Sequence, residues 1–314
     1  MKKKIISIGT RGSALALWQA NWVKDRLTQA YPEYEFNLVK IKTKGDKILD
    51  VALAKVGDKG LFVKEIEEAL VRNEIDLAVH SMKDVPTNTP QGLKIGAICE
   101  REDPHDVFIS ANKTKLEDMP QGSTVGTSSL RRIAQLSKHC SNLVFKDLRG
   151  NLNTRFSKLA NGEYSGMILA GAGVKRLGMA DKITQIIPFD VVLSAVGQGA
   201  VGIEIRENDP LIDDMVTRIL LHKASYIAIL AERSLMRRLE GGCQIPIGAL
   251  GKITGDKIDL DAIVASLDGK QIFRAHMNGD INNPETLGID LADKLLSMGA
   301  KKVLDEIALI NRTN

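Results

Sequence analysis

The chain opens with short apolar runs that alternate with segments whose apolar residues recur every three or four positions. Residues 4–8 have the length and composition of a buried strand, and residues 14–30 carry apolar side chains at helical spacing. The alternation continues with a strand at 35–41, a helix at 61–71 and a strand at 75–79. This order predicts a parallel-rich sheet with helices on both faces.

A second series of strands and helices follows a charged, proline-ended crossing at residues 100–104, which comes directly after a strand at 93–99. Beyond it the pattern predicts strands at 124–126, 143–145 and 167–170, helices at 130–139 and 152–160, and a short helix that ends at Leu177. Residues 196–200 are a glycine-rich return, and 201–205 alternate as a strand that we expect to rejoin the first sheet. Two lobes joined by paired crossings would hinge about a ligand-binding cleft.

The pattern changes again after Leu211. Helices near 211–221 and 226–239 precede strands at 247–252, 257–266 and 271–277, and two further helices extend to Ile310. The pairs Gly255-Asp256 and Asp268-Gly269 are typical of tight turns in an antiparallel meander. The sequence therefore predicts an α/β protein with a first lobe at 1–99 and 200–219, a second lobe at 100–199, and a small C-terminal α+β domain at 220–314.

Composition narrows the class of protein. The length of 314 residues suffices for two or three domains, and 44% hydrophobic with 26% charged residues is ordinary for a soluble globular chain, so we expect no membrane span. The N-terminal lysines precede an apolar run that is too short for a signal peptide, which favours a cytoplasmic protein. Residues 42–59 have glycine and aspartate punctuation and little periodicity, so they predict a loop.

Cysteine usage and charge exclude several kinds of site. The three cysteines, Cys99, Cys140 and Cys243, are widely separated and lack ligand spacing, so we expect neither a disulfide framework nor a metal site. A formal net charge of +4 with dispersed basic residues does not indicate a nucleic-acid partner.

Arginines recur where strands lead into helices. The segments 10–13, 127–132 and 149–155 each combine arginine with hydroxyl, amide or glycine residues, and Arg176 follows a further glycine-rich turn. A cation in the first turn opposes the helix dipole unless an anion binds there. Each junction alone is also typical of a solvated arginine, but together they indicate a polyanionic ligand. The chain lacks a P-loop or GxGxxG motif, so the pattern favours a multiply carboxylated small molecule over a nucleotide.

Asp84 follows directly after a predicted strand, in the segment HSMKDVP. An aspartate there can cap a turn before Pro86 or pair with Lys83. Alternatively, a carboxylate at the carboxyl end of a parallel strand can stabilise a developing cation. His80 is interpreted as a structural hydrogen-bonding group.

Cys243 lies between a glycine pair that can end a helix and Pro246, which prevents the helix from resuming. A free cysteine in a folded protein is often a small buried hydrophobic residue. A cysteine in a short rigid turn can instead present its thiol for chemistry.

These motifs resemble those of the porphobilinogen deaminase family. The segment ERSLMRRLEGGCQIPIG (232–248) matches its cofactor-attachment signature without a gap. The remaining matches, in family order, are IGTRGSALALWQA (8–20), HSMKDVP (80–86), GTSSLRR (126–132), LRGNLNTR (148–155), LAGAGVKRLG (169–178) and AVGQGAVGIE (195–204). The resemblance implies two periplasmic-binding-protein-like α/β lobes with a hinge, plus the C-terminal domain with an antiparallel sheet that carries the cysteine.

The resemblance also implies the reaction. The family condenses four porphobilinogen molecules head to tail, with loss of ammonia each time, and hydrolytically releases hydroxymethylbilane for tetrapyrrole and haem biosynthesis. The primer is a dipyrromethane cofactor bound through a thioether, here on Cys243. The implied partners are porphobilinogen and the growing polypyrrole, with no nucleic acid and no membrane, and the implied state is a monomer.

Site residues carry over by motif. Asp84 is the expected catalytic carboxylate, which would favour an azafulvene and the cationic coupling intermediate. The loop expected to cover the active site holds Lys55 and Lys59, with Phe62 beside it. The expected cofactor and substrate contacts are Arg11, Ser13, Lys83, Thr127, Ser129, Arg131, Arg132, Arg149, Gly150, Arg155, Arg176 and Gln198.

Three positions depart from the commonest family pattern: His105, Asn153 and Ser194, where arginine, glycine and proline are usual. From the residues alone, a non-catalytic anion-binding protein of the solute-binding type suits two hinged lobes equally well, and it predicts no covalent adduct. A cysteine-nucleophile hydrolase would need a histidine base near the thiolate, and His222 lies in no matching motif.

Overall fold

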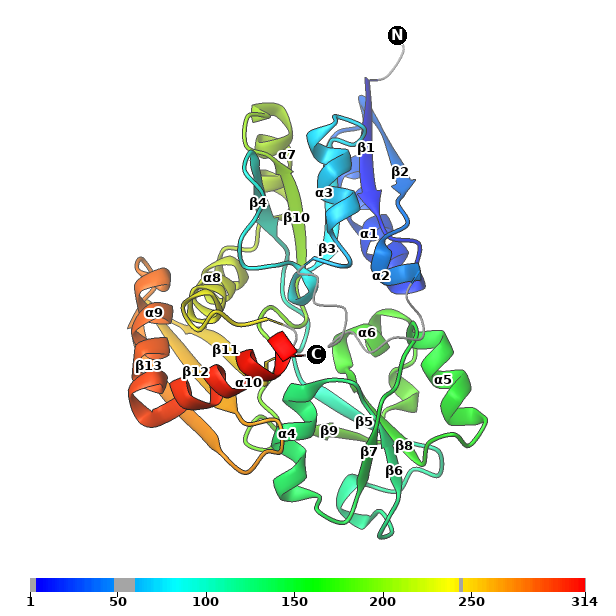
Figure 1. Cartoon of the computed structure of the whole chain (residues 1–314). Coiled ribbons are helices and arrows are strands. Elements are labelled where there is room, and N and C mark those ends of the chain that lie inside the picture. Colours follow the sequence, from blue (N-terminus) through cyan, green and yellow to red (C-terminus); the bar gives the residue numbers. More distant parts are fainter. Residues whose placement is uncertain (1–3, 48–59, 243–244, 314) are drawn as a thin grey trace. The chain divides into compact units, whose positions relative to one another are not determined.

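The computed structural model describes residues 4–47, 60–242 and 245–313 (Figure 1). These residues fall into two compact units, which are described separately. The first contains residues 4–47, 60–102 and 199–226, and the second contains 103–198, 227–242 and 245–313. Within the described ranges from residue 60 onward, the chain crosses between units after residues 102, 198 and 226.

The first unit is built on a five-stranded sheet with the order β2-β1-β3-β10-β4. Its strands are β1 (Lys4–Thr10), β2 (Tyr34–Lys40), β3 (Leu77–Ser81), β4 (Leu93–Ile98) and β10 (Val201–Arg206). β1 is parallel to β2 and β3, whereas β10 is antiparallel to both β3 and β4. The prediction that 201–205 rejoins the first sheet is confirmed, and the insertion of β10 makes the sheet mixed.

Helices cover both faces of this sheet. They are α1 (Ala14–Ala30), α2 (Lys44–Lys47), α3 (Lys64–Val71) and α7 (Pro210–Leu220), and β3 leads into a 3-10 turn at Met82–Asp84. α1 and α7 share one apolar cluster with Ile8, Val79 and Ile203, whereas α3 packs with Ala78 and Leu93 on the opposite face. Strand alternation sends neighbouring residues to opposite faces, which fixes the side to which each β3 residue points.

The second unit repeats this arrangement in a sheet with the order β7-β6-β8-β5-β9. The strands are β5 (Asp106–Ser110), β6 (Thr124–Gly126), β7 (Val144–Lys146), β8 (Gly166–Ala170) and β9 (Gln185–Ile187). The helices are α4 (Leu130–His139), α5 (Leu152–Ala160) and α6 (Gly171–Arg176), with 3-10 turns at Leu116–Asp118 and Ala180–Lys182. β6 is parallel to β7 and β8, and β5 is antiparallel to β8 and β9.

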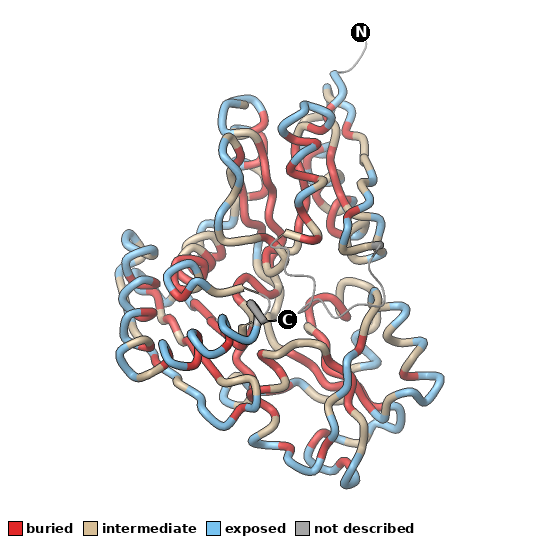
Figure 2. The backbone as a smooth tube through the Cα atoms, in the orientation of Figure 1, coloured by how far each residue is buried: buried red, intermediate tan, exposed pale blue. Residues whose placement is uncertain are grey.

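The sequence pattern missed β5 and β9. All five residues of β5 are buried, so the strand shows no alternation of polar and apolar positions, and β9 has only three residues. Figure 2 shows such buried positions running along the strands of each sheet.

The C-terminal part of the second unit is an antiparallel meander with helices. It contains α8 (Lys223–Arg238), β11 (Ile247–Thr254), β12 (Lys257–Ala265), β13 (Ile272–Asp280), α9 (Pro284–Leu295), a wide turn at Leu296–Ala300 and α10 (Lys301–Thr313). β12 pairs with β11 and β13 in antiparallel register, as predicted. The two tight turns place Gly255 and Gly269 at φ 65° and 69°, in the left-handed region that glycine tolerates.

Buried polar groups join the meander to the rest of its unit. Glu232 on α8 is fully buried and accepts hydrogen bonds from the backbone N–H groups of Gly197 and Gly251, both at 2.8 Å. Leu193, Leu250 and Ile263 add a shared apolar cluster. Among the described residues, no helix has the length and apolar character needed to cross a bilayer.

Candidate functional site

A pocket in the first unit lies where β1 and β3 end and α1 begins. The residues that line it are Arg11, Ser13, Leu15, Ala16, Gln19, Phe62, Val63, Val79, His80, Ser81 and Asp84. Carboxyl ends of neighbouring strands meet at one edge of a sheet, so this pocket brings together two motifs that are far apart in the sequence. Asp84, Arg11, Ser13 and Phe62 were all expected at the site from the sequence.

Local hydrogen bonds fix the polar groups of this pocket. Ser13 caps α1 by accepting from the backbone N–H of Ala16 at 3.3 Å. The Gln19 amide lies 3.0 Å from the Ser81 hydroxyl, which links α1 to the end of β3. Asp84 is the last residue of the 3-10 turn and is half-buried, as is its neighbour Lys83. The carboxylate of Asp84 is therefore presented from a short, well-anchored turn.

Arg11 is already bound by a carboxylate from the same chain. Its Nη2 lies 2.5 Å from Asp46 Oδ1, and its guanidinium stacks over the Phe62 ring at 4.1 Å from the centroid. Burial raises the pKa of Asp46, but hydrogen bonding and the charge of Arg11, with further hydrogen bonds from Thr43, lower it below its usual value. Asp46 thus shows how Arg11 receives a carboxylate. No local sequence pattern indicates this role of Asp46.

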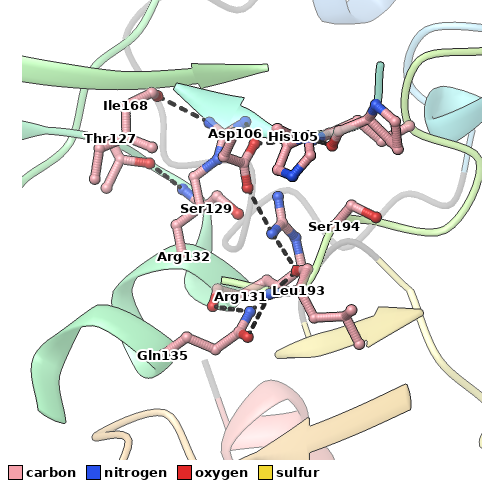
Figure 3. Close-up of polar contacts among 12 residues, drawn as sticks. His105, Asp106, Thr127, Ser129, Arg131, Arg132, Gln135, Ile168, Leu193 and Ser194 are labelled. Carbon is pink, nitrogen blue, oxygen red and sulfur yellow. Dashed lines mark hydrogen bonds and ion pairs between the residues drawn. The ribbon is translucent and has the colours of Figure 1, made fainter. Parts of the chain in front are cut away.

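The second unit contains a buried cluster around Asp106 (Figure 3). Arg131 Nη1 and Arg132 Nη2 each donate to the carboxylate at 2.7 Å, and Gln198 Nε2 donates at 2.9 Å. Asp106 is fully buried, and Arg131 and Arg132 are 5% and 6% exposed. The cluster therefore holds two cations and one anion away from water.

The charges of the cluster shift one another's protonation equilibria. Burial raises the pKa of Asp106, but the charges of Arg131 and Arg132 hold it well below the ordinary range. Burial lowers the pKa of Arg131, and the charge of Asp106 opposes that shift. Asp106 remains ionised at neutral pH, which leaves a net charge of about +1 on the three side chains.

The other contacts of the two arginines show which of their N–H groups already have acceptors. Arg131 also donates to the Leu193 carbonyl at 2.6 Å and Arg132 to the Ile168 carbonyl at 2.9 Å. Arg132 Nε is buried and has no hydrogen-bond partner among the described residues. Sequence reasoning found both arginines but missed Asp106, which lies in the undetected strand β5. Their predicted role in ligand binding stays a prediction.

Thr127 and Ser129 form the entry to α4. Thr127 is buried, and its hydroxyl accepts from the backbone N–H of Ser129 at 3.3 Å. Ser129 occupies the N-cap position but makes no side-chain capping bond. Its hydroxyl is therefore not used as a cap at this helix start.

The turn before α5 places two arginines beside one glycine. Gly150 has φ 103°, and a β-carbon there would lie 2.7 Å from Thr154 Cβ, so a side chain is excluded. Arg155 Nε donates to the Gly150 carbonyl at 2.9 Å, and Arg149 Nη2 lies 3.7 Å from Asp147 Oδ2. Both arginines are half-buried.

Other expected site residues have different placements. Arg176 is the last residue of α6, so it does not lie at a helix start. Lys55, Lys59 and Cys243 lie outside the described residues.

The three departures from the family pattern make local contacts. The His105 ring stacks on Phe189 at 3.7 Å, Ser194 Oγ lies 3.4 Å from the Ala249 carbonyl, and the Asn153 carbonyl accepts from Ser157.

The described residues suit a cofactor that carries several carboxylates. Arg132 Nε is a buried donor without an acceptor among the described residues, and Arg149 Nη2 lies 3.7 Å from Asp147 Oδ2. Guanidinium groups bind carboxylates with matching planar geometry. The donor set therefore fits a dipyrromethane with acetate and propionate groups.

Comparisons with known proteins agree along almost the whole chain. The family model described as "Porphobilinogen deaminase, dipyromethane cofactor binding domain" matches residues 6–214, and the model "Porphobilinogen deaminase, C-terminal domain" matches residues 226–297. The porphobilinogen deaminase of Carboxydothermus hydrogenoformans is 56% identical over 307 residues, which is 98% of each chain. The Desulfitobacterium hafniense protein of that name is 54% identical over 302 residues, covering 96% of this chain and 97% of its own.

Solved structures with similar folds are more distant. Substrate binding domain 2 of GlnP from Lactococcus lactis aligns with a TM-score of 0.44 at 13% identity, over 69% of this chain and 88% of that chain. A likeness of that degree carries no argument about function. The family models and the relatives are the evidence for family membership: the chain belongs to the porphobilinogen deaminase family.

Proposed function

We propose that this chain condenses four porphobilinogen molecules head to tail on a covalently bound dipyrromethane primer and releases hydroxymethylbilane by hydrolysis. The supporting observation is the pocket that places the Asp84 carboxylate among Arg11, Ser13 and Gln19 in a chain of this family. In each condensation a C–N bond breaks and the amine leaves as ammonia. The α-carbon of the primer or growing chain attacks the methylene carbon that the amine has left, which forms a C–C bond. That α-carbon then loses its proton, which balances the proton that the amine gains in leaving as ammonia.

Asp84 stabilises the positive charge that develops on the pyrrole when the amine leaves. A fixed carboxylate lowers the energy of a nearby cation most when both are shielded from water. Asp84 is half-buried and held by a short turn, so it needs little reorganisation as charge develops. Gln19 and Ser81 hold the end of the strand from which this turn begins.

The arginines bind the acetate and propionate groups of substrate and growing chain. Arg11 already receives a carboxylate from Asp46, so a substrate carboxylate exchanges for Asp46 at the same guanidinium. Arg149, Arg155 and Arg176 offer further half-buried cations in the second unit. Arg131 and Arg132 bring the net positive charge of the Asp106 cluster, and Arg132 Nε is available as a donor. Lys83, Thr127, Ser129, Gly150 and Gln198 complete the proposed polar contacts.

Cys243 is the proposed attachment point of the primer. The dipyrromethane supplies a pyrrole carbon that reacts with each activated substrate, and a covalent tether presents it at high effective concentration. Lys55 and Lys59 belong to the segment proposed to cover the site. We further propose that the enzyme acts as a monomer in the cytoplasm, with porphobilinogen and the growing polypyrrole as its partners and without nucleic acid or membrane.

Intact mass measurement followed by peptide mapping tests the proposal. The purified protein should carry an added mass equal to two deaminated porphobilinogen units on Cys243, and the Cys243→Ser variant should carry none. If the wild type is unmodified, it is incubated with porphobilinogen and weighed again. A cysteine that still remains unmodified would contradict the catalytic proposal and support a non-catalytic anion-binding protein.

A further inference from the structure

A buried group of ionisable side chains lies on the α3 face of the first sheet. Ala78 on β3 packs with α3, so His80, two residues further along the strand, points to the same face. Glu204 on β10 is directly opposite Ala78 in the antiparallel register and shares that face. Glu67 is on the buried side of α3, which packs against both strands. Three distant parts of the sequence thus converge beneath one helix.

These three side chains are almost entirely removed from water. Glu204 is 0% exposed, His80 is 5% exposed and Glu67 is 9% exposed. His80 Nε2 lies 3.0 Å from Glu204 Oε2, so that nitrogen donates to the carboxylate. Glu204 Oε1 has no hydrogen-bond partner within the described part of the chain. Burying an ionised carboxylate costs free energy unless a cation or hydrogen-bond donors pair with it. One histidine cannot neutralise the negative charge of two buried carboxylates.

Protonation of one of the two carboxylates removes the excess buried negative charge. Burial, reinforced by the negative charge of Glu204, raises the pKa of Glu67 to about 7, while the charge of His80 opposes the shift. Near neutral pH the group can therefore bind or release one proton. The other charged groups on α3 are Lys64, which favours ionised Glu67, Glu68, which opposes it, and Glu65, which accepts from the Lys44 backbone N–H. Arg206, further along β10, is paired with Asp76 and Asp209.

The group is also part of the wall of the candidate active site. His80 lines the same pocket as Asp84 and Arg11. It lies in β3 immediately before Ser81, and the 3-10 turn that presents Asp84 begins one residue later. A change of charge at Glu67 therefore changes the electrostatic potential in the pocket, because the protein interior between them screens charge less than water does.

We propose that Glu67, His80 and Glu204 form a proton-binding positioning cluster that sets how the activity depends on pH in the neutral range. The inference rests on the proposed function, because it assigns the cluster to the cation-forming step at Asp84. Loss of the Glu67 proton adds one negative charge beneath the pocket. That charge favours the cationic intermediate, so turnover rises with pH as the proton leaves. The cluster acts on the cation-forming step through Asp84.

The test compares pH profiles of kcat for holoenzyme variants from pH 5.5 to 8.5. Glu67→Gln keeps the shape of the side chain but fixes it neutral, so the rise with pH should disappear. Its kcat should match the wild type at low pH and fall roughly 3- to 10-fold below it at high pH. Glu67→Asp keeps an ionisable group and should restore the rise. Glu74→Gln removes an exposed carboxylate just beyond the same helix that pairs with Arg72; it is the matched control and should keep the wild-type profile.

Two results would overturn the inference. An unchanged profile in Glu67→Gln would show that the cluster does not set the pH dependence, and an equal loss at every pH would show a purely structural role. Thermal unfolding gives a second measurement, because a carboxyl whose pKa is raised by folding stabilises the protein at low pH and loses that contribution as pH rises toward 7. Glu67→Gln should therefore lose less stability between pH 5 and pH 8 than the wild type. Asp84→Asn separates the two proposals: turnover without Asp84 contradicts the proposed function, whereas an unchanged Glu67→Gln profile contradicts only the cluster.

Discussion

Asp106→Asn should destabilise the second unit far more than a typical substitution of a charged residue. The asparagine keeps the size of the side chain, so the change removes charge without creating a large cavity. It leaves Arg131 and Arg132 buried without the counter-charge of Asp106 and weakens two hydrogen bonds of 2.7 Å. Removing one partner of a buried ion pair costs about 3–5 kcal/mol, because the remaining charge stays desolvated.

The carbonyls of Leu193 and Ile168 still accept from the two arginines, and they limit but do not cancel this cost. Urea unfolding at pH 7 measures the free energy of unfolding, and the thermal midpoint should fall by roughly 6–20 °C. Asp261→Asn is the control, since Asp261 pairs with Arg274 on an exposed strand and should cost less than about 1 kcal/mol. Equal costs for the two variants would refute the reasoning.

The difference in unfolding free energy between wild type and Asp106→Asn should depend on pH, because folding changes the pKa of Asp106. The pKa of Asp106 is lowered by folding, so its contribution to stability is fully present above the unfolded value of 3.8 and is lost as pH falls below that value. The difference in unfolding free energy between wild type and Asp106→Asn should therefore be constant from pH 7 to about 5 and shrink below pH 4. A difference that grows on acidification would contradict the assignment of Asp106 as the ionised partner.

Three further predictions concern the candidate site. Asp84→Asn should fold normally and lose nearly all turnover; circular dichroism checks the fold, and near-wild-type turnover would count against its role. Arg149→Ala should impair cofactor assembly or elongation, and mass spectrometry should show a changed distribution of enzyme-bound intermediates. Arg72 is an exposed arginine, so the control variant Arg72→Ala should leave that distribution unchanged. Gly150→Ala should cost about 1–3 kcal/mol, because alanine is strained at φ 103° and its β-carbon would meet Thr154, and a neutral unfolding midpoint would disprove that strain.

The sequence alone determined the elements whose signal is local. Amphipathic helices such as α7 and the glycine turns of the meander were recognised because periodicity and φ preference belong to neighbouring residues. The motifs around Asp84, Arg149 and Cys243 were likewise readable as short segments, and their family resemblance agrees with the matched family models.

The tertiary structure alone decided which groups share an environment. Asp106 meets Arg131 and Arg132 because β5 inserts antiparallel beside β8, and a fully buried strand gives no alternating pattern to announce it. Asp46 meets Arg11 across 35 positions, and Glu204 meets His80 across 124. The charge state of a buried side chain depends on desolvation and on neighbours from other elements, so it follows from the fold and cannot be read from any single stretch of sequence.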